Sequence, residues 1–263
     1  MYDINESSFN RADKDYDRIT RMLVKHKIYT EEFIAQRRSS MRRTLNLEEA
    51  CQQADFISES VIEDIPLKKK VWSDIGKLTP AECILTTNTS YLLPSYFAQE
   101  TGNPSMFCAF HFHDVFTARV VDIMPHPSTD SQVIPLLKEV GVKLNQIPVV
   151  IKKETHGYLF NKMFGTILLE AGKMWAAGLA DHEDIDRSWI GNFGMRIGPF
   201  GMIDEVGLDT LLHVSKIIPD SAKDAFLSKV QEKVDAGELG IKSGKGFYTY
   251  PNPAYKAKDF LIG

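Results

Sequence analysis

Short apolar runs alternate with amphipathic stretches through the first half of the chain. Runs of strand length occupy residues 55–60 (DFISES), 83–87 (CILTT), 106–112, 120–124 and 147–151. Helical periodicity marks residues 5–24, the stretch after Thr30, and residues 47–54, 65–78 and 133–140. Strands of four to eight residues separated by helices are typical of an α/β layer with a parallel sheet. The pattern therefore predicts a Rossmann-like α/β domain.

The pattern changes near residue 153, because strand-like runs disappear and helical periodicity continues to the end. Helices are predicted over residues 158–177, 181–190, 209–218 and 221–236, and the sequence GPFG at 198–201 is expected to interrupt them. We therefore predict two domains. Residues 1–152 form the sheet domain, and residues 153–263 form an all-helical domain.

Composition narrows the possible classes of protein. The 263 residues are 43% hydrophobic and 25% charged, with a net charge of -4, which is typical of globular proteins and gives no basic excess for nucleic acid. No stretch approaches the ~18 apolar residues of a spanning helix, and the charged start MYDINESSFNRADKDYDR has no apolar signal-peptide core. We expect a cytoplasmic protein with no membrane contact. Its three scattered cysteines favour reduced thiols over disulfides or a zinc site.

Candidate chemistry lies at the end of the run 106–112, because ligands bind at the carboxyl ends of parallel strands. His111 lies near the end of this run, and Asp122 follows one hairpin-length later. Histidine, with a pKa near ~6.5, exchanges protons at neutral pH, and a neighbouring carboxylate fixes its tautomer and stabilises the imidazolium. The pair indicates an acid/base enzyme. The alternative is a satisfied core histidine beside a strand-end charge.

A second histidine, His113, makes a His-x-His pair with His111. On a strand, the two side chains are expected to point to opposite faces. We therefore expect no metal site here.

Several segments, taken together, resemble the L-3-hydroxyacyl-CoA dehydrogenase family and its relatives that oxidise other 3-hydroxy acids. The segments are DFISESVIEDIPLKKKVWSDI, CILTTNTSYL, FHFHDV with VVDIMPHP, THGYLFNKM, GPFGMIDEVGLDT and KSGKGFYTY, in family order over nearly the whole chain. The resemblance implies an NAD-dependent oxidoreductase. It would interconvert an L-3-hydroxyacyl-CoA, or a related small 3-hydroxy acid, and the 3-keto product.

The resemblance also assigns roles to individual residues. It makes His111 the general base, with Asp122 as its orienting carboxylate, and it places Ser90 and Asn161 against the substrate. Glu63, Lys68, Asn88 and Lys242 match positions that contact the cofactor. Without the resemblance, Ser90 is equally a turn former, Asn161 a polar residue at a helix start, and Lys68 a solvated helix charge.

The start of the chain departs from the family. The family's first strand and its G-x-G-x-x-G turn, which cradles the pyrophosphate, have no counterpart in the sequence. Met1-Tyr2-Asp3 resembles the second strand, whose terminal carboxylate binds the adenine ribose, so Asp3 favours NAD over NADP. We expect an N-terminally truncated Rossmann-like domain that lacks roughly 30 residues of a βαβ unit. The alternative is a chain that uses no cofactor.

Two further departures lie beside the candidate base. Asp114 stands where the family usually has asparagine, and its charge would stabilise the cationic ring of oxidised nicotinamide. Asp122 stands where the family usually has glutamate, and the loop before it is one residue shorter than usual. The shorter loop either restores contact with His111 or leaves it lost.

The expected partners are a small-molecule substrate and a second copy of the chain. Apolar faces over residues 158–177 and 209–218 exceed the needs of a small domain, and the family commonly pairs there, so we predict a homodimer through the helical domain. Basic residues that could recognise CoA, or form only a solvated face, are Lys14, Arg18, Arg21, Lys25 and Lys27. The alternative from another class is a non-catalytic paralogue or dimerisation module that has lost cofactor binding.

Overall fold

The computed structural model describes residues 1–113, 115, 118–215 and 223–262. The chain divides into two compact units, residues 1–158 and residues 159–263. The division falls after Tyr158 rather than after residue 152, because Tyr158 packs with Ala109, Met124 and Ile151 of the first unit. Each unit is described here by itself.

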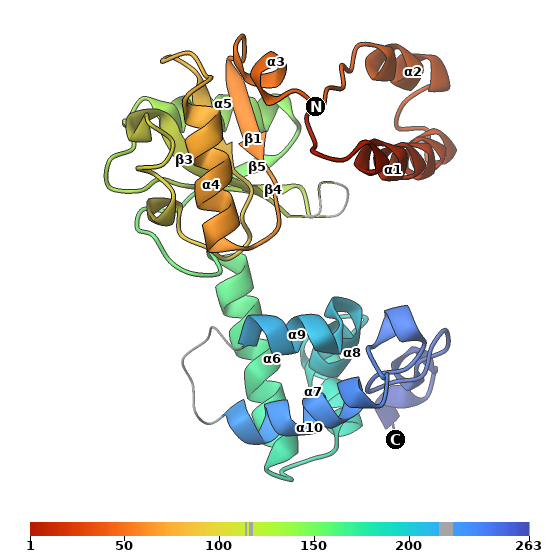
Figure 1. The fold of residues 1–263 in the computed structure, drawn as a ribbon. Helices are drawn as coiled ribbons and strands as arrows, with labels where there is room; N and C mark the ends of the chain where they lie inside the picture. The colour runs from red at the N-terminus through yellow and green to blue at the C-terminus, as the bar shows by residue number, and fades with distance from the viewer. Residues whose placement is uncertain (114, 116–117, 216–222, 263) are drawn as a thin grey trace. The chain divides into compact units, whose positions relative to one another are not determined.

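The first unit contains a five-stranded sheet in the order β1-β2-β3-β4-β5 (Figure 1). The strands are β1 Phe56–Glu59, β2 Ile84–Thr87, β3 Phe107–Phe112, β4 Val120–Met124 and β5 Ile147–Val150. The expected parallel pairing is confirmed for β1, β2 and β3. The connection from β3 to β4 is too short for a crossover, so β4 is antiparallel to β3, and β5 is parallel to β4.

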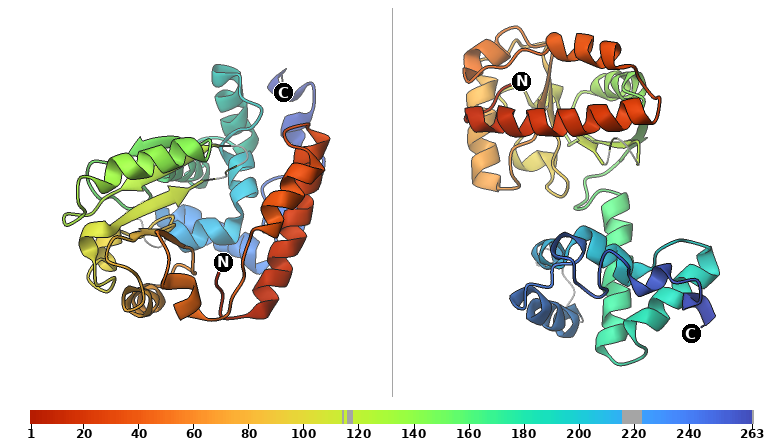
Figure 2. Two further views of the ribbon diagram at one scale, coloured as in Figure 1. Left: turned by 90° about the horizontal axis from the view of Figure 1, so that it is seen from above. Right: turned by 90° about the vertical axis from the view of Figure 1, so that its right-hand side faces the viewer.

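Two helices cover opposite faces of this sheet, α4 (Ile65–Gly76) and α5 (Val133–Lys143), as Figure 2 shows. Trp72 of α4 packs edge-on against Phe107 of β3, with ring centroids 4.9 Å apart. Leu137 of α5 packs in a cluster with Phe110 of β3. Since successive side chains of a strand alternate between faces, Phe107 and Phe110 serve opposite layers of the core.

The first unit also contains further helices before β1 and short helical turns in its loops. It contains α1 Glu6–Lys25, α2 Glu31–Ser39 and α3 Leu47–Cys51, with short 3-10 turns at Pro94–Tyr96 and Pro104–Met106. Arg38 of α2 holds two carboxylates of α1, Asp13 and Asp17, each at 2.6 Å. At the start of the chain, Tyr2 forms an isolated parallel bridge with Thr44.

The second unit is built from helices. They are α6 Phe160–Ala176, α7 His182–Phe193, α8 Pro199–Val206, α9 Leu208–Ser215 and α10 Asp224–Asp235, with 3-10 turns at Ile241–Ser243, Ala254–Lys256 and Phe260–Ile262. We expected residues 198–201 to interrupt the helices, but only Gly198 lies outside a helix, and residues 199–201 belong to α8. Gly198 precedes α8 and Pro199 starts it, because proline has no N–H to lose in the first turn and its φ suits a helix.

A buried carboxylate, Asp186 of α7, organises the core of the second unit. Its Oδ1 accepts the backbone N–H of Phe200 at 2.7 Å, and its Oδ2 accepts the N–H of Gly201 at 3.0 Å and the Tyr248 hydroxyl at 2.9 Å. Burial raises the pKa of Asp186 to about 6, against the lowering effect of these neutral donors.

Among the residues that the structure describes, no helix has the length and apolarity needed to cross a membrane. The cellular location stays a prediction from the sequence.

Candidate active site

Polar side chains gather at the carboxyl ends of β1, β2 and β3, which are parallel and adjacent and so end at the same edge. Asn88, directly after β2, joins these ends. Its Oδ1 accepts the backbone N–H of Phe112 in β3 at 2.8 Å, and its own N–H donates to the carbonyl of Glu59 in β1 at 2.8 Å. Such an edge is where open α/β sheets bind ligands.

Glu63 fixes the turn that follows β2. Both of its carboxylate oxygens accept the Thr89 hydroxyl, at 2.8 and 2.7 Å, and Oε1 accepts the backbone N–H of Ser90 at 2.6 Å. Ser90 is exposed in this turn. The predicted residues Glu63, Asn88 and Ser90 are therefore brought together at one edge of the sheet.

Lys68 is buried, with 1% of its surface exposed, so the alternative of a solvated helix charge is wrong. Its Nζ lies 2.8 Å from Glu59 Oε1 and donates to the carbonyl of Val61 at 2.9 Å. The other oxygen of Glu59 accepts the Thr87 hydroxyl at 2.7 Å. A buried ammonium needs such partners, because burial of an unpaired charge is costly.

The role of Glu59 was missed from the sequence. The available signal was a carboxylate at the last position of an apolar strand, followed by a lysine on the next helix. The ion pair with Lys68 links the end of β1 to α4, and the backbone carbonyl of the same Glu59 accepts the N–H of Asn88. Glu59 thus positions the edge rather than facing it.

His111 and Asp122 are directly opposite each other in the β3–β4 register. The distance between His111 Nδ1 and Asp122 Oδ2 is 3.4 Å, and both side chains are buried. The shorter aspartate therefore still reaches the imidazole, at the long end of hydrogen-bond distances.

His113 also contacts Asp122, which corrects the expectation that it points away from His111. Its Nε2 lies 2.8 Å from the same oxygen, Oδ2, and the two imidazole centroids are 4.5 Å apart. The expectation was wrong because side chains alternate with a period of two, so residues two apart share a face. One carboxylate oxygen therefore serves two imidazoles.

The surroundings of Asp122 set its charge state. Burial pushes the pKa of Asp122 upward, but hydrogen bonds from His111 and His113 pull it down further, so the pKa lies below its ordinary value. An ionised carboxylate only accepts hydrogen bonds, so the facing nitrogen of His111, Nδ1, carries a proton. In neutral His111 the lone pair then lies on Nε2, which is free to act as a base.

Tyr158 is a further candidate for the site, although it was not predicted as a site residue from the sequence. It is fully buried, and its ring centroid lies 4.9 Å from that of His111. Its hydroxyl has no hydrogen-bond partner among the described residues, and burial raises its pKa well above the ordinary value. The only sequence signal was its place after Gly157 in THGYLF.

The remaining predicted residues are not among the described residues that contact one another at the carboxyl ends of β1, β2 and β3 in the first unit. Asn161, in the first turn of α6, and Lys242 belong to the second unit, where Lys242 Nζ donates to both carboxylate oxygens of Asp209, at 2.5 and 2.6 Å. Asp3 Oδ1 accepts the backbone N–H of Asn5 at 2.8 Å. Asp114 lies outside the described residues.

Comparison with known families identifies both units. Residues 1–155 match the 3-hydroxyacyl-CoA dehydrogenase NAD binding domain, and residues 157–250 match the C-terminal domain of the same family. The chain belongs to the 3-hydroxyacyl-CoA dehydrogenase family. It is an NAD-dependent oxidoreductase by this membership.

Similar proteins span most of this family member. A probable 3-hydroxyacyl-CoA dehydrogenase of Caenorhabditis elegans is 28% identical over 259 residues, covering 95% of this chain and 87% of the relative. A solved diketoreductase, described as acting on dicarbonyl compounds, is 31% identical with a TM-score of 0.88, covering 95% and 89% of the two chains. (S)-3-hydroxybutyryl-CoA dehydrogenase from Ralstonia eutropha, at 24% identity, has a TM-score of 0.86 over 96% and 90%. The expected Rossmann-like domain followed by a helical domain is confirmed.

The sheet edge of this family member carries polar groups of the kinds that bind a dinucleotide. Three parallel strands end there together, with amide, hydroxyl and carboxylate groups on successive turns. These donors and acceptors suit the carboxamide and ribose hydroxyls of a dinucleotide. The Gly-rich turn that cradles a pyrophosphate is not among the 263 residues.

Proposed function

We propose that the protein interconverts an L-3-hydroxyacyl-CoA, or a related small 3-hydroxy acid, and its 3-keto product, with His111 as general base. The observation that carries this proposal is the contact between Asp122 and His111 Nδ1 beside the carboxyl edge of the sheet. It leaves Nε2 of His111 as the basic nitrogen, which is the requirement for removing a proton from an alcohol.

The proposed reaction moves one proton and one hydride. His111 Nε2 accepts the proton of the 3-hydroxyl while C3 gives up a hydride, and bound NAD supplies the acceptor for that hydride. Asp122 stabilises the imidazolium that results, because it already faces Nδ1–H and is ionised. In the reductive direction the imidazolium returns the proton to the carbonyl oxygen.

Family resemblance supports the binding residues of this proposal. Ser90 and Asn161 are the proposed substrate contacts, and Ser90 has the support of an exposed turn that Glu63 holds in place. A hydroxyl and an amide bind the reacting oxygen without neutralising the base. The proposed cofactor contacts are Asp3, Glu63, Lys68, Asn88, Asp114 and Lys242.

Oxidation of NADH by acetoacetyl-CoA tests the proposal directly, in the protein that carries these 263 residues. We expect turnover in the wild type and a loss of about 10²- to 10⁴-fold in kcat for His111→Ala, because the base is removed. His213→Ala, on the exposed side of α9, is the matched control and should keep its activity. Full activity in His111→Ala would remove the base assignment.

A second substrate class follows from the likeness to the diketoreductase. A free 1,3-dicarbonyl compound offers the same 3-keto group without CoA, so kcat/KM for such a compound and for acetoacetyl-CoA should be compared. A preference of tenfold or more for acetoacetyl-CoA, about 1.4 kcal/mol, identifies a CoA thioester enzyme. NADH binding without turnover of either compound would favour the non-catalytic alternative.

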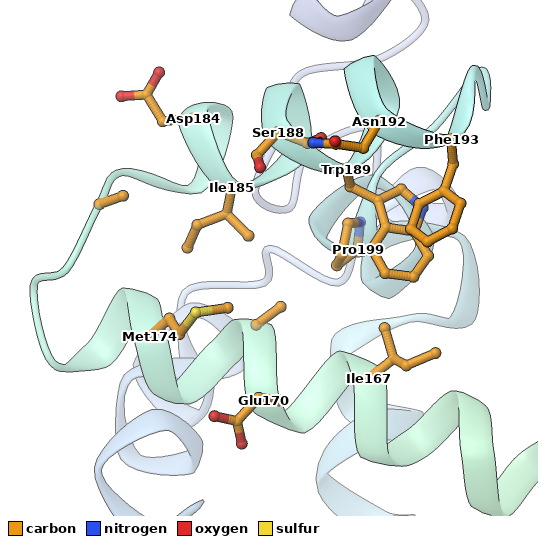
Figure 3. A pocket seen from close by; sticks show the side chains of 12 residues that line it. Ile167, Glu170, Met174, Asp184, Ile185, Ser188, Trp189, Asn192, Phe193 and Pro199 are labelled. Atoms are coloured by element: carbon orange, nitrogen blue, oxygen red, sulfur yellow. The ribbon is translucent and has the colours of Figure 1, made fainter.

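We also propose that the second unit forms a homodimer. A groove with a volume of about 630 Å³ lies between α6 and α7. Figure 3 shows its lining side chains, which are largely apolar and include Ile167, Met174 and Trp189. At its end, Phe193 is 66% exposed and packs beside Trp189. Exposed apolar surface of this kind favours pairing with a self-complementary copy. Light scattering at the monomer mass would contradict the dimer, and Phe193→Glu should weaken it.

A further inference from the structure

The two histidines and the carboxylate form a compact set of metal-binding groups. One ring nitrogen each from His111 and His113 and one oxygen of Asp122 lie within 4.8 Å of one another. The cluster belongs wholly to the first unit, and β3 and β4 hold two of its members in register. His113 follows β3 directly, and its N–H donates to the carbonyl of Val120 at 3.3 Å.

The chemistry of this set matches a divalent transition metal ion. Imidazole nitrogens and a carboxylate are the ligands of Zn²⁺ and related ions, bound at about 2.0–2.2 Å. Tetrahedral coordination at that length separates ligand atoms by about 3.3 Å. The observed separations from Asp122 Oδ2 are 3.4 Å to His111 and 2.8 Å to His113, so small side-chain shifts would admit an ion.

The site is also preorganised for a metal. His111 and Asp122 are almost completely buried, and the side chain of His113 is 10% exposed, which leaves it as the member nearest to solvent. Ligands held by packing lose little rotamer freedom on binding, which favours a defined site over chance surface coordination.

We propose that His111, His113 and Asp122 form a binding site for Zn²⁺ or a similar divalent transition ion, and that the bound ion inhibits the dehydrogenase reaction. Coordination through Nδ1 of His111 moves the single imidazole proton to Nε2. Nε2 then donates rather than accepts, and the carboxylate is occupied by the ion. The base is therefore switched off while the metal is bound.

Metal binding and inhibition are supported by different observations. Metal binding depends only on the ligand set, whereas inhibition rests on the proposed function of His111. His113 makes the parts separable, because it is a proposed metal ligand but not the proposed base. The variant His113→Phe keeps a ring of similar shape and removes one ligand.

Calorimetric titration with ZnCl₂ tests binding in the full chain, after dialysis against a chelator. We expect one site per chain, with affinity at least tenfold weaker in His113→Phe and unchanged in His213→Phe, whose histidine is exposed on α9. His113→Asn and circular dichroism guard against misfolding of the phenylalanine variant. Equal affinity in wild type and both His113 variants, as binding through cysteine thiols would give, overturns the proposal.

Cobalt gives a spectroscopic measure of the same site. Co²⁺ bound by two imidazoles and a carboxylate should produce visible absorption bands that disappear in His113→Phe and on addition of excess Zn²⁺. Absence of these bands at saturating Co²⁺ contradicts the proposed ligand set.

Turnover measurements then test inhibition. Zn²⁺ should suppress NADH oxidation in the wild type, a chelator should reverse it, and His113→Phe should need at least tenfold more Zn²⁺. Tight Zn²⁺ binding with unaffected turnover overturns the inhibitory part. If neither wild type nor variant turns over any substrate, the proposed function fails while the calorimetric result on binding still stands.

Discussion

Each unit of the protein contains a buried aspartate whose pKa is shifted, and Asp122 and Asp186 are shifted in opposite directions. Asp122 in the first unit faces two imidazoles, which can become cations, and its pKa lies below the ordinary value. Among the described residues, Asp186 in the second unit accepts hydrogen bonds from neutral N–H and O–H donors, and burial raises its pKa to about 6. Burial therefore does not distinguish Asp122, a candidate for catalysis, from Asp186, which stabilises the helical core. The ionisable partner distinguishes them.

The largest expected effect comes from substituting the two aspartates in parallel. Asp122→Asn should lower kcat by about 10²- to 10⁴-fold, because the charge that orients His111 and stabilises its imidazolium is lost. Asp186→Asn should leave kcat largely unchanged in protein shown to be folded by circular dichroism. NADH oxidation measures both. Similar kcat losses in the two folded variants would end the distinction.

The Glu59–Lys68 pair extends the comparison to a buried carboxylate whose partner is a lysine rather than a histidine or a neutral donor. Lys68→Met should lower the free energy of unfolding by about 3–5 kcal/mol, because it leaves a buried carboxylate uncompensated. Urea unfolding measures the change. Lys70→Met, which breaks an exposed pair with Asp74, is the control and should cost about 0–1 kcal/mol. Equal small losses in the two variants would contradict the importance of the buried Glu59–Lys68 pair for stability.

The pH dependence of stability should carry opposite signs for the two aspartates. Asp186 binds its proton more tightly when folded, so its contribution is complete below pH 3.8 and is lost as pH rises through about 6. The change from 3.8 to about 6 corresponds to roughly 3 kcal/mol. Asp122 contributes stability above pH 3.8 that is lost as pH falls through its lowered pKa.

Urea unfolding of Asp186→Asn and wild type between pH 4 and 6 measures the first sign. The variant should gain stability relative to wild type as pH rises, because it lacks the Asp186 contribution. Asp122→Asn should lose stability relative to wild type on going from pH 2 to 4. If the stability of both variants relative to wild type changed in the same direction as pH rises, the pKa shifts assigned to Asp122 and Asp186 would be wrong.

The smallest expected effect concerns Tyr158, whose buried hydroxyl has no partner among the described residues. Tyr158→Phe should raise the free energy of unfolding by about 1 kcal/mol, because an unsatisfied buried polar group is removed. Chemical unfolding measures this. A destabilised variant would show that the hydroxyl is paired, and a concurrent fall in kcat would place it against the substrate.

Local patterns predicted the strands and helices of the sheet unit closely. The runs at 83–87 and 120–124 correspond to β2 and β4, because apolar segments of strand length bounded by turn residues favour buried strands. The antiparallel direction of β4 follows from a loop too short for a crossover. The start of α8 at Pro199 was missed, because glycine and proline indicate a break but also suit a helix start.

The site was predicted less evenly. His111 and Asp122 were found because a short hairpin connection places them in register. The burial of Lys68 was not predicted, because burial of a charged side chain depends on a partner, Glu59, which reaches it from another element. The prediction that His113 points away from His111 was wrong although the sequence was sufficient to avoid the error. Side chains of a strand alternate between faces with a period of two, so residues 111 and 113 share a face.

The sequence by itself determined the order of the elements, the family, and the residue types that can exchange a proton. These follow from local periodicity and from motifs whose chemistry depends on few neighbouring residues. Tertiary structure alone decided that one oxygen of Asp122 contacts both His111 and His113, and that the donors to Asp186 in the described part of the chain are neutral. The physical reason is that charge state and ligand geometry depend on groups brought within a few ångströms from distant parts of the chain.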